Sequence, residues 1–165
     1  MATKPKQKLN LLPQAISARN RGVELDLDWV SSIQANTSAI ERRASSIGSR
    51  RSVKKQHQAA WLLQAVKCID LTTLSGDDTI GRVKRLCAKA KNPISKKLLE
   101  DLDLDNITVG AVCVYHDMIE TAVSKLRGTE IPVAAVSTGF PAGLSPLPLR
   151  IAEIEYSVSA GASEI

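Results

Sequence analysis

Apolar segments of strand and helix period alternate along most of this chain, and this order constrains its fold more than any other feature. Short apolar runs at residues 68–72, 109–115 and 131–137 predict strands, because turn-forming residues bound them. A last run at residues 162–165, after Gly161, looks like the entry to a fourth strand. Strands that alternate with helices predict a parallel sheet with right-handed crossovers.

The segments between the predicted strands carry helix signals. Asp77 or Asp78 is expected to cap one helix and Asp117 another, and a short helix is expected over about residues 94–102. Pro148 is expected at the first position of the last helix. The apolar residues expected inside are Ile80, Val83, Leu86, Cys87, Ala90, Met118, Ala122, Leu126, Leu149, Ala152 and Tyr156.

The chain divides into three parts by composition. Residues 1–22 show no sustained period and predict a disordered tail. Residues 23–66 predict a helical extension, of which the last helix has one buried side, and residues 67–165 predict an incomplete (β/α) barrel. The caps expected in the extension are Asp28, Ser38 and Ser52.

Two architectures share this order of elements, an open doubly wound sheet and a (β/α)₈ barrel. No Gly-x-Gly-x-x-Gly or Gly-x-x-x-x-Gly-Lys-Ser/Thr motif follows any predicted strand, so nothing supports a nucleotide-binding open sheet. Aromatic residues make up 3% of the chain, which leaves Leu, Ile, Val and Ala to build a core. The absence of these motifs favours the barrel.

Cysteine use and hydropathy indicate a cytoplasmic protein. Cys68, Cys87 and Cys113 are an odd number and widely spaced, which predicts reduced thiols. The N-terminal residues show no apolar h-region, and no apolar run approaches the roughly 18 residues that a membrane helix requires, so neither a secretory signal nor a membrane span is expected.

The positive charge is concentrated in the first part of the chain. Residues 1–67 hold 12 Lys/Arg against 4 Asp/Glu, whereas residues 68–165 hold 10 against 13. No nucleic-acid recognition motif accompanies this asymmetry, so nucleic-acid binding rests on charge alone and a solvated basic extension is expected.

Polar residues interrupt the first predicted strand. Cys68, Asp70 and Thr72 share one of its faces by the period of two. An Asp and a Thr in an apolar barrel interior cost free energy unless they form hydrogen bonds. Their partners are each other, water or a substrate, so a satisfied structural network and a binding site both stay open.

Several separate motifs together resemble the deoxyribose-phosphate aldolase family. They are IDLTTL at residues 69–74, AVCVY at 111–115, GFPAG at 139–143 and GASEI at 161–165. Upstream, RGVELDL at 21–27 and AAWLL at 59–63 resemble the N-terminal extension of the animal form. The resemblance covers roughly residues 19–165.

This resemblance implies a TIM barrel of which the chain holds about three β/α units and the start of a fourth strand. The implied reaction is the reversible cleavage of 2-deoxyribose 5-phosphate to glyceraldehyde 3-phosphate and acetaldehyde through a lysine Schiff base, without a metal or organic cofactor. The family's pocket residues fall on Asp70, Thr72 and Cys113. The Schiff-base lysine, a second lysine and a relay aspartate would all lie beyond Ile165, so the chain alone is expected to be inactive.

No residue within the chain is expected to replace the Schiff-base lysine and its partner groups. The lysines near the predicted strands fall on polar helix faces or loops, and the phosphate-binding loops of a barrel follow its last strands. His116 stands where the family usually has a proline, and with Cys113 it does not define a catalytic dyad. His57 has no further metal ligand nearby in the sequence, and residues 145–148 depart from the family's polar loop.

A second hypothesis is a non-catalytic protein that associates with other subunits. Three strands and the start of a fourth cannot close a barrel, so an exposed strand edge would be available for a homo- or hetero-oligomer. The sugar phosphate would then be a substrate of the complete enzyme only, and no membrane partner is expected.

Overall fold

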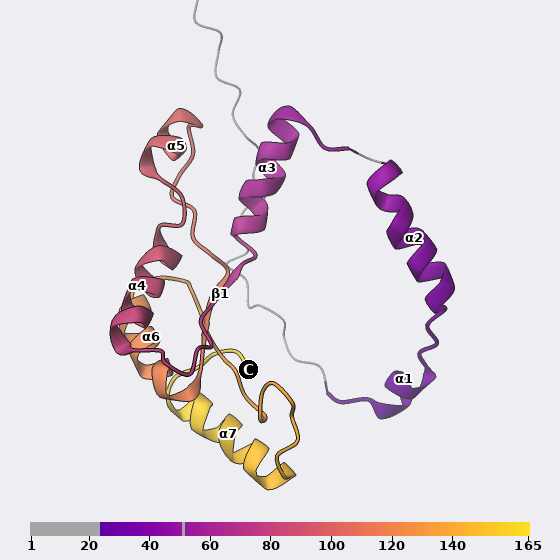
Figure 1. Ribbon diagram of the computed structural model, residues 1–165, viewed down its shortest axis with the longest axis vertical. Coiled ribbons are helices and arrows are strands. Elements are labelled where there is room, and N and C mark those ends of the chain that lie inside the picture. The colour runs from indigo at the N-terminus through magenta and orange to yellow at the C-terminus, as the bar shows by residue number, and fades with distance from the viewer. Residues whose placement is uncertain (1–23, 51) are drawn as a thin grey trace, which may run out of the picture.

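The computed structural model describes residues 24–50 and 52–165 (Figure 1). The predicted disordered tail, residues 1–22, lies outside the described residues. The helices are α1 Leu27–Ser32, α2 Thr37–Arg50, α3 Lys55–Val66, α4 Ile80–Lys91, α5 Lys96–Asp101, α6 Ile119–Leu126 and α7 Leu147–Ser159, with a 3₁₀ turn η1 at His116–Met118. The strands are β1 Asp70–Thr72, β2 Ala111–Val114 and β3 Val133–Ala135.

The sheet is parallel, and its strands follow the order β1-β2-β3. The predicted entry to a fourth strand is confirmed, because Glu164 forms a parallel bridge with Ala134. The amide of Ala135 donates to the carbonyl of Glu164 at 2.9 Å, and the amide of Ser163 donates to Val133 at 2.9 Å. The sheet therefore continues past β3 on the side away from β1.

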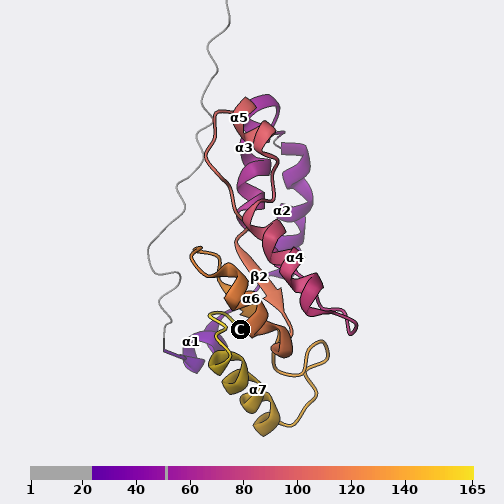
Figure 2. The same cartoon turned by 90° about the vertical axis from the view of Figure 1, so that its left-hand side faces the viewer.

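This order decides between the two architectures. In the common doubly wound sheet the strand order reverses, so that a fourth strand lies beside the first. Here the fourth segment lies beside β3, as in a barrel whose strands follow the chain. Helices α4 and α6 pack against each other and against β2, so both crossovers lie on one face of the sheet (Figure 2).

The core lies between these helices and the sheet. Strand side chains that face the helices are fully or almost fully buried: Val112, Val114, Val133 and Ala135. The predicted inward residues Val83, Cys87, Ala90, Ala122 and Leu126 are buried beside them, together with Ile119, whereas Ile80 is 54% exposed. A second cluster joins α3 to α5 through Leu63, Leu99 and Ile107.

Several predicted caps are wrong by a few residues. Asp26, not Asp28, accepts a hydrogen bond from the first turn of α1 at 2.8 Å. Asn36 rather than Ser38 does so for α2, and Thr79 rather than Asp77 or Asp78 caps α4. In each case two or more good capping residues stand close together, and the one directly before the first helical residue takes the role.

Three further helix starts differ from prediction. The N-cap of α3 is Lys54, which makes no side-chain capping bond, and Ser52 precedes it. Asp117 lies inside η1 rather than at a cap. Pro148 is the second residue of α7, one position later than predicted, and Gly161 ends α7 with a φ of +102°. A left-handed glycine at this point lets the chain turn back to the sheet.

The face that α7 turns inward also differs from prediction. Leu149, Ala152 and Tyr156 are exposed, whereas Ser157 is completely buried and Glu153 is partly buried. Glu153 and Ser157 face inward because they meet polar groups just after β2 and in the loop after β3.

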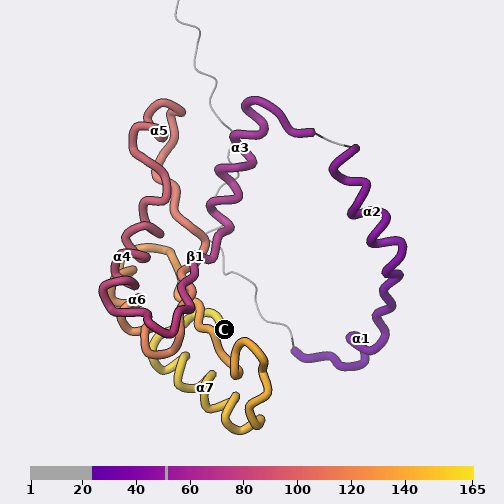
Figure 3. The backbone as a smooth tube through the Cα atoms, in the orientation of Figure 1, coloured from indigo at the N-terminus to yellow at the C-terminus, as the bar shows by residue number. Residues whose placement is uncertain are grey.

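The N-terminal helices bury little. Figure 3 shows α1 and α2 apart from the helices packed on the sheet, and neither of the two contains a buried residue. In α3 the predicted buried side is reduced to Leu63, and Trp61 is 67% exposed. Within the described residues, no helix has the length and apolarity needed to cross a bilayer.

The matched pair Ile119 and Ile151 tests this core. Ile119→Ala is expected to lower the free energy of unfolding by about 2–5 kcal/mol, because it empties a fully buried site between α6 and the sheet. Ile151→Ala, at a site that is 47% exposed, should change it by about 0.5 kcal/mol or less. Urea denaturation measures both, and equal losses would contradict the packing described here.

Candidate functional site

The structure brings Asp70, Thr72 and Cys113 together on adjacent strands. The register pairs Thr72 with Cys113 and Asp70 with Ala111, so these side chains lie on one face of the sheet. This is the face opposite the helix-covered core. Asp70 and Thr72 are exposed, and Cys113 is partly buried. The Thr72 hydroxyl donates to the carbonyl of Asp70 at 2.8 Å.

The expectation that Cys68 shares this strand is wrong. The chain turns at the end of α3, β1 begins only at Asp70, and Cys68 is an exposed free thiol. In the described part of the chain Asp70 and Thr72 also face open space rather than an apolar interior, so they do not form a buried structural network.

Electrostatics keep the Cys113 thiol protonated. Burial raises its pKa above the ordinary value, the nearby carboxylate of Asp70 raises it further, and a hydrogen bond with Thr72 offsets only part of this. The thiolate is the nucleophilic form of cysteine, so this environment opposes nucleophilic catalysis. His116 is not its base, because the two ring nitrogens of His116 face Ser157 and Glu153.

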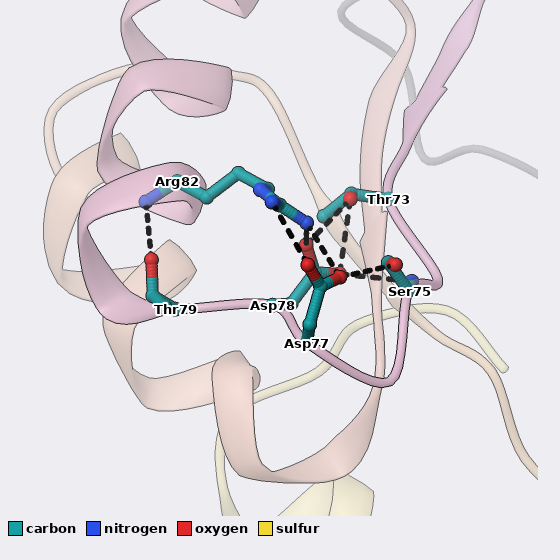
Figure 4. Close-up of polar contacts among 6 residues, drawn as sticks. All are labelled: Thr73, Ser75, Asp77, Asp78, Thr79 and Arg82. Atoms are coloured by element: carbon teal, nitrogen blue, oxygen red, sulfur yellow. Dashed lines mark hydrogen bonds and ion pairs between the residues drawn. The ribbon is translucent and has the colours of Figure 1, made fainter.

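The loop after β1 is tied to the first turn of α4 by a polar cluster (Figure 4). The Thr73 hydroxyl donates to the carboxylate of Asp78 at 2.9 Å, and the backbone amide of Ser75 donates to the same carboxylate at 3.1 Å. Arg82 on α4 donates to Asp77 at 2.9 Å and to Asp78 at 3.1 Å. The cluster therefore fixes the chain that leaves the carboxyl end of β1.

The two carboxylates of this cluster favour their charged forms. Hydrogen bonds from Arg82 and Ser75, with the positive charge of Arg82, lower the pKa of Asp77 from 3.8 to about 2. Burial by itself would raise the pKa of Asp78, but hydrogen bonds from Thr73, Arg82 and Ser75 outweigh it and lower the pKa. The pKa of Arg82 is raised by the same two partners.

A second set of polar contacts holds the loop after β3. The amide of Gly139 donates to a carboxylate oxygen of Glu153 at 2.6 Å, and His116 contacts both Glu153 and Ser157. Sequence reasoning missed Glu153 and Ser157. The available signal was their spacing of four residues on α7, together with a histidine just after β2.

Neither an amine nucleophile nor a metal centre is evident in the part of the chain that the structure describes. Across residues 24–50 and 52–165, every lysine lies within a helix or directly beside one, outside the three strands. No group of three or more His, Cys, Asp or Glu among these residues is arranged to hold a metal ion.

The fold and this face define the class of protein. Parallel strands in chain order, helices on one face and polar side chains near the carboxyl ends of adjacent strands are the arrangement of a (β/α)₈ barrel wall. The crystal structure of a Coccidioides immitis protein assigned as a deoxyribose-phosphate aldolase shares this fold, with a TM-score of 0.50 and 23% identity. The match covers 79% of this chain and 47% of that one.

Curated sequences identify the relatives more narrowly. The chain is 55% identical to deoxyribose-phosphate aldolase of Mus musculus, and 54% identical to those of Bos taurus and Homo sapiens, over 154 residues. A scan against protein-family models finds no match. The chain is thus homologous to deoxyribose-phosphate aldolase over 91% of its residues, and it spans about half of the length of these relatives (48%).

The loop cluster predicts a pH dependence of stability. The folded chain lowers the pKa of Asp77 from 3.8 to about 2, so it binds that proton less tightly than the unfolded chain does. The resulting stability is present above pH 3.8 and is lost as the pH falls towards about 2. The urea midpoint should therefore fall more steeply over this range in the wild type than in Arg82→Gln.

Arg85→Gln is the matched control, because Arg85 is exposed on the same helix and outside the cluster. It should follow the wild-type profile. Parallel profiles of the wild type and Arg82→Gln would show that the Arg82 pairing does not shift these carboxylates.

Proposed function

We propose that the chain forms about half of the barrel of a deoxyribose-phosphate aldolase and contributes one wall of its substrate pocket. The observation that carries this proposal is the identity of 54–55% with curated aldolases over 91% of the chain. The adjacency of Asp70, Thr72 and Cys113 on the open face of the sheet supports it, because these positions carry the pocket residues that the resemblance implies.

The proposed reaction is the reversible cleavage of 2-deoxyribose 5-phosphate to glyceraldehyde 3-phosphate and acetaldehyde. The Asp70 carboxylate and the Thr72 hydroxyl provide hydrogen-bond partners for sugar hydroxyls, and the protonated Cys113 provides a small uncharged surface. We assign these three residues to substrate binding, not to bond cleavage.

The proposed chemistry also requires an amine nucleophile. A lysine forms a Schiff base only when it is deprotonated at the carbonyl, which requires a desolvated site or a neighbouring cation. The described lysines lie within or directly beside helices and outside the strands, so we assign this amine to the half of the relatives that the chain does not cover. The chain by itself is then inactive. Its three free cysteines are consistent with the cytoplasm, where we place the protein.

Retro-aldol assays test this function. The purified chain should not cleave 2-deoxyribose 5-phosphate, and borohydride should not trap the substrate on it. A chimera of this chain with the part of the mouse aldolase that it leaves uncovered should be active and should be trapped. Cleavage by the chain alone would overturn the assignment of the amine, and an inactive, folded chimera would overturn the proposed function.

Within the chimera, Asp70→Asn should lower kcat/KM about tenfold or more, because a neutral amide replaces the carboxylate and the charge-assisted hydrogen bond to the substrate is weakened. Asp105→Asn, at an exposed position before β2, is the matched control and should leave kcat/KM unchanged. Equal activity of the two variants would remove Asp70 from the pocket.

A second candidate function is association without catalysis. Exposed apolar residues favour it, among them Leu27, Trp29, Ile40 and Ile47 on α1 and α2 and Trp61 on α3. In the described sheet β1 pairs with β2 alone, which leaves its other edge open to a strand from another chain. Sedimentation velocity should then show a dimer or larger species. A compact monomer at all concentrations would contradict association.

A further inference from the structure

Three contacts connect the carboxyl ends of β2 and β3 to α7. His116, just after β2, places Nδ1 2.9 Å from Oγ of Ser157 and Nε2 3.4 Å from Oε1 of Glu153. The other carboxylate oxygen of Glu153 accepts the Gly139 amide at 2.6 Å. Both carboxylate oxygens of Glu153 therefore have a partner: His116, just after β2, and the Gly139 amide in the loop after β3.

The loop that this carboxylate holds has a strained backbone. Thr138 and Gly139 both have positive φ, at +64° and +73°. Glycine adopts this region freely, but a β-branched residue such as threonine adopts it only where surrounding contacts enforce it. The bond from Gly139 to Glu153 is such a contact, directly after Thr138.

The Ser157 hydroxyl has one proton, and this determines which group donates in each of its hydrogen bonds. Its single hydroxyl proton goes to the carbonyl of Glu153, at 2.9 Å, so Oγ accepts from Nδ1 of His116. Nε2 then faces the carboxylate of Glu153, and a proton on Nε2 turns that contact into an ion pair. The side chains of His116 and Glu153 are 24% and 32% exposed, so this pair is only partly screened by water.

We propose that Glu153 is a positioning residue that fixes the loop after β3, and that His116 and Ser157 hold its carboxylate in place. The inference deepens the proposed aldolase function and rests on it, because barrel enzymes build their substrate pockets from the loops at this end of the strands. Glu153 acts through the backbone of Gly139, and its position in α7 explains why that helix turns polar residues inward.

Amide hydrogen exchange of the full chain, resolved at single residues, tests the proposal. Glu153→Ala should accelerate exchange at Gly139 about tenfold or more, because a charge-assisted bond is lost. Glu153→Gln keeps an acceptor oxygen and should exchange more slowly than Glu153→Ala. His116→Ala and Ser157→Ala should each accelerate Gly139 by about two- to tenfold.

Two controls separate positioning from general loss of structure. Glu155→Ala, exposed on the same helix, should leave Gly139 unchanged. The Val112 amide, which donates to Pro132 in the sheet, should keep its protection in every variant. Unchanged exchange at Gly139 in Glu153→Ala, or equal acceleration at Val112, would overturn the proposal.

This measurement requires no catalysis, so its failure can be distinguished from failure of the aldolase function. Loss of the expected effect at Gly139, with an active chimera, overturns the positioning role alone. The expected effect with an inactive chimera supports the contact from Glu153 to the loop and overturns its use in the aldolase reaction.

Discussion

The parallel pairing of β2 with both of its neighbours is the constraint on which the rest of the structure depends. This register places Val112 and Val114 against α4 and α6, and it places Cys113 beside Thr72 on the opposite face. A shift of one residue would exchange these two faces, burying the polar set and exposing the valines. The register of β2 with its neighbours therefore determines the positions of both the core and the candidate pocket.

The parts of the fold that apolar periodicity controls were predictable from the sequence. The three strands, the continuation at Glu164 and the buried residues Val83, Cys87 and Ala122 all follow from burial. Helix caps were less predictable, because Asp26 and Asp28 are equally able to accept an amide and only the local backbone distinguishes them.

Prediction failed most clearly where a contact with a residue distant in sequence determines which side of a helix faces inward. The apolar residues of α7 predicted a conventional inward stripe, yet His116, 41 residues before Ser157, draws the polar side of that helix inward. Of the candidate site, the adjacency of Thr72 and Cys113 was accessible from strand period and family resemblance. Glu153 was not accessible, because its role depends on a backbone amide in a loop with positive φ.

Carboxylates connect two strand-end loops to the helices that follow them. Asp78 joins the loop after β1 to Arg82 on α4, and Glu153 on α7 holds the loop after β3. Exposed and partly exposed ion pairs add little to the free energy of folding, whereas their hydrogen bonds are directional. The apolar face thus accounts for most of the stability, and charged contacts set the loop geometry around the polar face. Substitutions at these carboxylates are therefore expected to alter loop position more than overall folding.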